Sequence, residues 1–203
     1  MNAWNDRLNK LTGKTRFVVS RILIHLKGPE VPTLLGVMNR AAQEAIENDG
    51  DLYVLGKSLA EICQDLLQRE SSWMSASNEG EVLWSEEEAS EYLNELFTDS
   101  TSRYLSDIGD DSPDGNSSDD AALKIPMTSN LVVIITIACE GEVPQLEADL
   151  ADISALKSAL SQLCALQTQD RFRAIQLNFS PDQIGYVLTD DHVLQQFPEL
   201  IPL

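Results

Sequence analysis

Apolar residues recur at helical spacing through the first part of the chain. In residues 2–27 they fall at steps of three, four or seven, as on one face of an α-helix. The same spacing returns in three further segments, 32–48, 52–70 and 86–104. The stretch from Ser75 to Glu81 predicts a polar loop between the last two. Four helices joined by short loops predict a helical bundle-like domain over residues 1–105.

The most apolar run, Leu131–Cys139, shows no alternation and is rich in β-branched residues. It predicts a strand buried on both faces, central to the C-terminal third. A helical pattern capped by Asp152 and an alternating strand over 171–179 follow it. Strand–helix–strand predicts a parallel pair with a right-handed crossover. A short helix begun by Thr189 completes a predicted small α/β (β-α-β-α) domain over residues 123–203.

Between these units lies an acidic segment, residues 106–122, with six aspartates among glycine, serine, proline and asparagine. It cannot bury enough apolar surface to order itself, so it predicts a disordered linker. A fragment of a calcium loop begins at Asp110, but Ala121 stands where the closing glutamate is needed. The predicted fold class is α+β, with an N-terminal helical unit followed by the α/β domain.

The net charge is −19, which argues against nucleic acid as a partner because phosphates would be repelled. Residues 1–27 carry six basic residues and one acid, a net charge of +5, so the remainder carries −24. A basic amphipathic helix is typical of a membrane-surface helix, and also of a core helix with a solvated charged face. The predicted membrane- or partner-binding residues are Trp4, Arg7, Lys10, Lys14, Arg16, Phe17 and Arg21.

The three cysteines are widely spaced with apolar flanks, which indicates reduced thiols and a cytoplasmic location. No close cysteine pair is present, so no structural zinc site is expected. Acidic residues from Glu86 to Glu95 could hold a metal, but their pattern favours a solvated, capped helix face. We expect no metal and no cofactor.

No catalytic motif is present in the sequence. His192, beside Asp190 and Asp191, could act as a general base, but no nucleophile motif stands near it. Cys139 ends the central strand, where α/β sheets often place reactive groups, yet a buried thiol is the more common role of such a residue.

The C-terminal third resembles a cyanobacterial and plastid family catalogued as domain of unknown function 1517. The resemblance is carried by residues 131–138, Gly141, the 156–166 helix, 174–179, 187–191 and 197–200. It covers roughly the last 75 residues. It implies a photosynthetic setting and an accessory role near the thylakoid membrane.

Two hypotheses follow. The first is a non-catalytic accessory or regulatory protein that binds a protein complex, with a peripheral contact to an anionic membrane as its variant. The alternative is a small enzyme or ligand-binding protein, with a site at the C-terminal ends of the parallel strands near Cys139 and Phe179. The first is favoured because motifs are absent. The sequence leaves the oligomeric state open.

Overall fold

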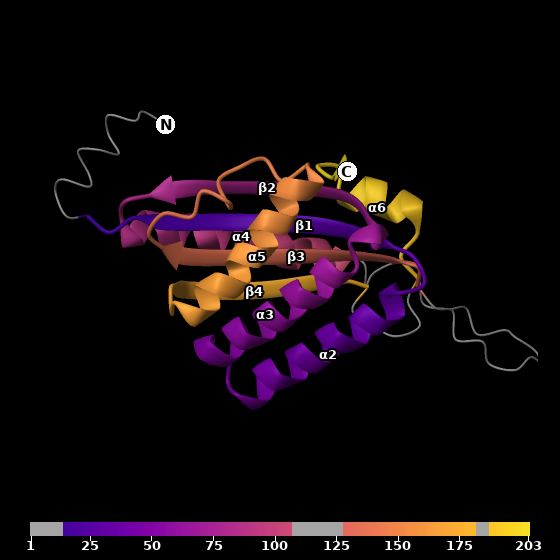
Figure 1. The fold of residues 1–203 in the computed structure, drawn as a ribbon, viewed down its shortest axis with the longest axis horizontal. Helices are drawn as coiled ribbons and strands as arrows, with labels where there is room; N and C mark the ends of the chain where they lie inside the picture. The colour runs from indigo at the N-terminus through magenta and orange to yellow at the C-terminus, as the bar shows by residue number, and fades with distance from the viewer. Residues whose placement is uncertain (1–13, 107–127, 182–186) are drawn as a thin grey trace, which may run out of the picture.

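The structure, a computed structural model, describes residues 14–106, 128–181 and 187–203. Its centre is a five-stranded antiparallel sheet in the order β4-β3-β1-β2-β5 (Figure 1). The strands are β1 (Phe17–Lys27), β2 (Trp73–Leu83), β3 (Asn130–Glu140), β4 (Phe172–Ser180) and β5 (Ile201–Pro202).

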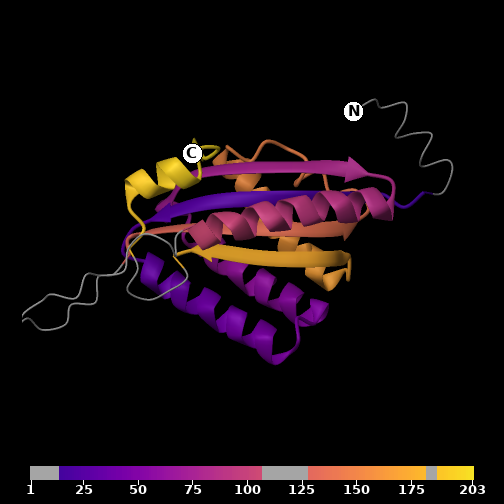
Figure 2. The same cartoon turned by 180° about the vertical axis from the view of Figure 1, so that it is seen from behind.

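Helices cover both faces of this sheet. One face carries α2 (Val31–Glu47), α3 (Leu52–Gln68) and α5 (Ile153–Thr168), in front of the sheet in Figure 1. Figure 2 shows the other face, covered by α4 (Glu86–Ser106) and the short α6 (Asp190–Gln196). A single 3-10 turn, Glu70–Ser72, leads into β2. The result is a three-layer arrangement with a core on each side of the sheet.

The helices predicted after residue 30 are confirmed, and side-chain caps explain where α3 and α5 begin. The Asp51 side chain accepts a hydrogen bond from the Val54 amide at the start of α3. Asp152 accepts from the amides of Ser154 and Ala155 at the start of α5. Such side chains satisfy backbone donors that the first turn of a helix leaves unpaired.

The prediction of a helix over residues 2–27 is wrong over Phe17–Lys27, which form β1. All residues of β1 except Lys27 are buried, because helices pack on both faces of the strand. In a run that is apolar at nearly every position, apolar residues occur at helical and at strand spacing alike. The helical periodicity of this segment therefore does not distinguish a helix from a strand. Its β-branched residues, such as Val18, Val19 and Ile22, favour the strand. The predicted N-terminal helical bundle is therefore not formed.

The predicted polar loop from Ser75 to Glu81 is likewise a strand, β2. Every residue from Ser75 to Leu83 pairs with β1, and Ser75 and Ala76 also pair with the short β5. Gly80 allows close packing, since a Cβ at this position would lie 2.5 Å from the Val19 carbonyl oxygen.

The strand predicted at Leu131–Cys139 is confirmed as β3, and every residue of this run is buried. The predicted parallel crossover is wrong, because β3 and β4 are antiparallel, with Val133 opposite Phe179. Residues 141–152 carry the chain across the sheet before α5 returns it. Asn78 holds this crossing segment: its Nδ2 donates to the Ala148 carbonyl at 2.9 Å, and its Oδ1 accepts from the Leu150 amide at 2.8 Å.

Residues from both predicted domains contribute to one sheet, since β1 lies between β2 and β3. The predicted linker, 106–122, and the calcium-loop fragment lie outside the described residues, apart from Ser106 at the end of α4. Within the described ranges, no helix has the length and apolarity needed to cross a membrane.

Candidate functional site

The predicted membrane- or partner-binding residues do not form one exposed face where they are described. Trp4, Arg7 and Lys10 lie outside the described residues. Lys14 is exposed, but Phe17 is buried under α4.

Arg16 is held internally: its Nη1 donates to the Gly141 carbonyl at 2.9 Å and its Nη2 pairs with Glu147 at 2.8 Å.

Arg21 is an internal cation rather than a surface one, since only 4% of it is exposed. It pairs with Glu79 on β2 and Asp99 on α4, and donates to the Ser100 hydroxyl at 3.2 Å. Burial lowers the pKa of Arg21, but the hydrogen bonds that it donates to Asp99 and Glu79 outweigh this effect and raise the pKa overall. Arg21 therefore joins three elements of the fold.

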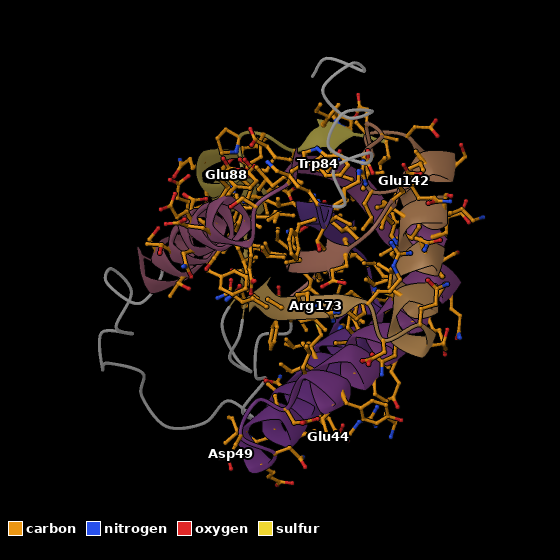
Figure 3. The ribbon with its side chains drawn as sticks, turned by 90° about the vertical axis from the view of Figure 1, so that its left-hand side faces the viewer. Glu44, Asp49, Trp84, Glu88, Glu142 and Arg173 are labelled. Atoms are coloured by element: carbon orange, nitrogen blue, oxygen red, sulfur yellow. The ribbon has the colours of Figure 1, made fainter. Side chains whose placement is uncertain are left out.

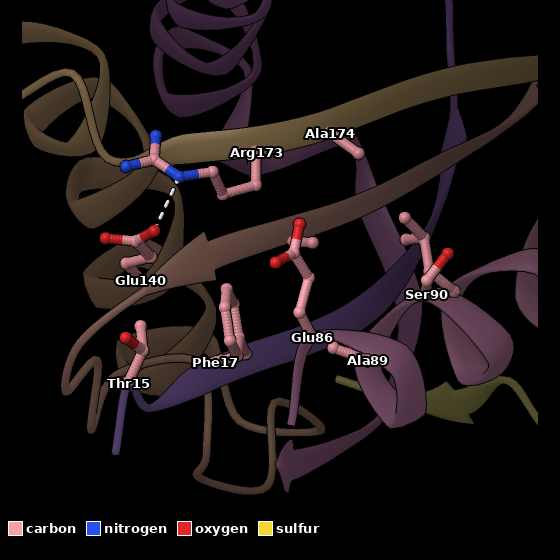
Figure 4. A pocket seen from close by; sticks show the side chains of 10 residues that line it. Thr15, Phe17, Glu86, Ala89, Ser90, Glu140, Arg173 and Ala174 are labelled. Atoms are coloured by element: carbon pink, nitrogen blue, oxygen red, sulfur yellow. Dashed lines mark hydrogen bonds and ion pairs between the residues drawn. The ribbon is translucent and has the colours of Figure 1, made fainter. Parts of the chain in front are cut away.

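A cleft of about 330 Å³ lies between the N-terminal half of α4 and the sheet. Figure 3 views the molecule from this end, with Glu88 on α4 and Arg173 on β4. The cleft is lined by the ends of β1, β3 and β4 and by the first turns of α4, through Thr15, Phe17, Glu86, Ala89, Ser90, Leu93, Ala138, Glu140, Arg173 and Ala174 (Figure 4).

The cleft exists because small residues meet at its floor. Ala138 on β3 lies opposite Ala174 on β4 in the sheet register. Ala89 of α4 packs into the same apolar cluster, together with Phe17. A helix–sheet contact built from methyl groups leaves space that longer side chains would fill. The floor of the cleft is therefore apolar, and the cleft is open at its rim.

The rim carries charge. Arg173 Nε donates to Glu140 Oε1 at 2.7 Å, an interaction that raises the pKa of Arg173. Glu86 extends from α4 toward β3 (Figure 4) and is exposed. The Glu86 carboxylate also attracts Arg173 electrostatically and contributes to the raised pKa of Arg173. With two carboxylates and one guanidinium, the rim has a net negative charge and suits a cationic ligand.

The alternative site predicted near Cys139 and Phe179 is not assembled. In the antiparallel pair, Phe179 lies opposite Val133, so about 20 Å of strand separates it from Cys139. Cys139 is buried, and burial raises the pKa of its thiol to about 12. Asp190 accepts a hydrogen bond from Asn130 at the far end of β3. Asp190, His192 and Cys139 therefore do not line a common pocket.

A buried polar network under α6 was missed from the sequence. The Ser75 hydroxyl lies 3.3 Å from His25 Nδ1, and His25 Nε2 lies 3.0 Å from Asn130 Oδ1. Asn130 Nδ2 donates to the Leu188 carbonyl and to Asp190, which pairs with Lys27. Burial lowers the pKa of His25, against the opposing effect of the Asn130 bond. The network fastens α6 to the sheet.

Sequence reasoning also missed most of the cleft, because alanines carry no chemical signal. That Ala138 lies opposite Ala174 can be predicted only when the pairing of β3 with β4 is known. Within the described residues, no three His, Cys, Asp or Glu side chains gather in a metal-binding arrangement.

A model of the family described as "Protein of unknown function (DUF1517)" matches residues 16–203. The chain therefore belongs to this family. The match extends the resemblance, expected only for the last third, to nearly the whole chain. No curated protein matches this chain. No solved structure matches it either.

Proposed function

We propose that this chain is a non-catalytic accessory or regulatory protein that binds a partner protein. Its cleft beside α4 receives an apolar side chain of the partner that is flanked by basic residues. The observation that carries the proposal is the apolar floor of Ala89, Ala138 and Ala174 with the carboxylate of Glu86 at its rim.

The size of the cleft supports an inserted side chain. A volume of about 330 Å³ lies at the lower end of the range for small-molecule pockets and accommodates one large apolar side chain. Buried apolar anchors of this kind supply most of the free energy at many protein interfaces.

Charge supports a basic partner. The chain carries −19 in total, which raises the local concentration of cationic partners and speeds their association. The same charge opposes contact with an anionic membrane. Of the four predicted contact residues that the structure describes, Lys14 alone is exposed, so we favour a protein partner over a membrane.

The cellular setting belongs to the proposal as well. A cyanobacterial-type photosynthetic cell and a cytoplasmic location with a peripheral thylakoid contact rest on the sequence resemblance and the cysteine pattern. Fractionation of source cells into cytoplasm and thylakoids tests this part separately.

Two synthetic peptides test the binding proposal: Ac-Gly-Lys-Phe-Lys-Gly-NH2 and its counterpart with both lysines replaced by glutamate. The full chain is labelled with ¹³C at alanine methyl groups, and each peptide is titrated by NMR. We expect the basic peptide to shift the methyl signals of Ala89, Ala138 and Ala174. Equal binding of the acidic peptide, or shifts confined to other alanines, would contradict the proposal.

Charge reversals at neighbouring positions provide the matched control. Glu86 lines the cleft, whereas Glu87 is exposed on α4 and does not. Glu86→Lys should weaken binding of the basic peptide about fivefold, or about 1 kcal/mol, as for an exposed ion pair. Glu87→Lys changes the net charge equally and should leave the affinity within about twofold. Equal losses would show that only the overall charge matters.

A further inference from the structure

Two of the three cysteines meet where α3 packs against α5. Cys63 lies on α3 and Cys164 on α5. Gly56 and Ala60 precede Cys63 at helical spacing on α3, so this face carries small residues. A Cβ on Gly56 would overlap the Gln167 side chain of α5, which shows how closely the two helices approach.

The two sulfurs have different surroundings. Cys164 Sγ lies 3.6 Å from the carbonyl oxygen of Ala60, three residues before Cys63 on α3, so the two thiols are neighbours and each shifts the pKa of the other. Cys63 is completely buried, whereas Cys164 is partly exposed to solvent. A reagent from solution therefore reaches Cys164 first.

The protonation of the two thiols follows from this contact. The neighbouring Cys63 side chain lowers the pKa of Cys164 to about 7, whereas Cys164 and burial raise the pKa of Cys63 well above its usual value. Cys164 is thus the sulfur that forms a thiolate near neutral pH, and thiolates are the reactive form of cysteine.

We propose that Cys63 and Cys164 are a redox pair that forms a reversible disulfide between α3 and α5 when the protein meets a peroxide. The Cys164 thiolate attacks one oxygen of hydrogen peroxide, the O–O bond breaks, and the hydroxide released takes up a proton to leave as water. Cys164 becomes a sulfenic acid. The Cys63 sulfur then attacks the Cys164 sulfur, its proton leaves with the sulfenic hydroxyl as a second water, and the S–S bond forms. Two thiols and one peroxide thus give one disulfide and two waters.

The disulfide would fasten the α2–α3 hairpin to α5. Because it would close a long loop of chain, it should raise the midpoint of thermal unfolding by about 5 °C or more. A dithiol reductant reverses the reaction through thiol–disulfide exchange. In a reducing compartment such pairs act as transient redox sensors.

The test uses the full chain, reduced and then treated with hydrogen peroxide at a small molar excess. Remaining thiols are alkylated under denaturing conditions, and the protein is analysed by mass spectrometry before and after digestion with trypsin. Lys57, Arg69, Lys157 and Arg171 place the three cysteines on separate tryptic peptides. We expect a loss of two hydrogens, a Cys63–Cys164 cross-linked peptide, an alkylated Cys139, and reversal by a dithiol.

Variants identify the roles of the two sulfurs. Cys63→Ser should stop at a sulfenic acid on Cys164 that dimedone traps, whereas Cys164→Ser should form no disulfide. Cys139→Ser is the matched control and should form the cross-link as the native chain does. Direct oxidation of Cys164 to sulfinic acid in the native chain, or a disulfide that includes Cys139, would overturn the proposal. If Cys63→Ser fails to fold, the cross-linked tryptic peptides of the native chain and of Cys139→Ser are sufficient to test the proposed disulfide.

Discussion

Arg21 Nη1 in β1 donates a hydrogen bond to Asp99 Oδ2 in α4 across a distance of 2.5 Å. The same guanidinium pairs with Glu79 of β2, so one buried cation holds the central strand, its neighbour and the covering helix together. A basic residue that the sequence pattern assigned to a docking surface is instead part of the interior. This contact has a measurable cost when it is removed.

Arg21→Met should lower the free energy of unfolding by about 2–3 kcal/mol. Breaking a fully buried ion pair costs about 3–5 kcal/mol, but Glu79 and Asp99 are each almost half exposed and remain partly hydrated. Urea unfolding followed by circular dichroism measures the change. Arg40→Met, at an exposed position on α2, is the control and should stay within about 0.5 kcal/mol. Equal stability of both variants would show that Arg21 is not a structural residue.

The sequence predicted the helices well and the sheet poorly, for one physical reason. Helices α3 and α5 can be recognised in the sequence by a polar cap and one apolar face, both of which are local features. Strand β1 is apolar on both faces because helices from distant parts of the chain cover them, so its hydrophobic spacing does not separate it from a helix and only its β-branched residues favour a strand. Strand β2 shows the reverse problem, since its small polar residues are accommodated only by pairing with β1.

The candidate cleft was harder to predict than the fold. The sequence pattern predicts Phe17 as a docking residue and Glu86 as part of an acidic helix face. Their meeting depends on the antiparallel register that places Ala138 opposite Ala174. Pairing partners in a sheet are set by long-range contacts, which a single sequence does not reveal.

Protonation of His25 should lower the stability of the protein as the pH falls below about 6.5, the ordinary pKa of histidine. Burial lowers the pKa of His25 in the folded protein, so the unfolded chain binds its proton first as the pH falls. The His25 contribution is complete above about pH 6.5, the unfolded value, and is lost as the pH falls toward the lowered folded value. Unfolding in urea at a series of pH values between 7 and 5 should therefore show decreasing stability, beyond the carboxylate effects seen at lower pH.

His25→Gln should flatten the slope of the unfolding free energy against pH between pH 7 and 5, because glutamine cannot take up a proton. His192→Gln is the matched control, since the chain has two histidines, and it should keep the slope. A slope that persists in His25→Gln would assign the pH dependence to other groups.

Two glycine substitutions should change stability in opposite directions. Gly80→Ala should destabilise by about 1–3 kcal/mol, because the new methyl group would press on the backbone at Val19. Gly36→Ala, on α2, meets no atom within 4 Å and should stabilise by about 0.5–1 kcal/mol through helix propensity. Thermal unfolding of both variants measures these changes. An unchanged stability of Gly80→Ala would contradict the close approach of β1 and β2 at this position.

A cut in the chain tests whether both predicted domains share one core. A specific protease site is inserted after Gly115, outside the described residues, and the purified protein is cleaved there. Because β1 pairs with β3 along its whole length, the two pieces should elute together from a size-exclusion column and separate only in denaturant. Pieces that separate under native conditions and remain folded would restore the two-domain interpretation.

The central claim is that the cleft beside α4 takes up an apolar side chain, and intermolecular NOE spectroscopy tests it most directly. The alanine-methyl-labelled chain is mixed with unlabelled Ac-Gly-Lys-Phe-Lys-Gly-NH2. Ser90→Trp, which places a large ring in the cleft, and Ser158→Trp, on the exposed side of α5, serve as blocked and control variants. The account predicts NOEs from the phenylalanine ring to the methyl groups of Ala89, Ala138 and Ala174, present in the native chain and in Ser158→Trp and absent in Ser90→Trp. Peptide binding without these NOEs, or with the same affinity in Ser90→Trp, would contradict it.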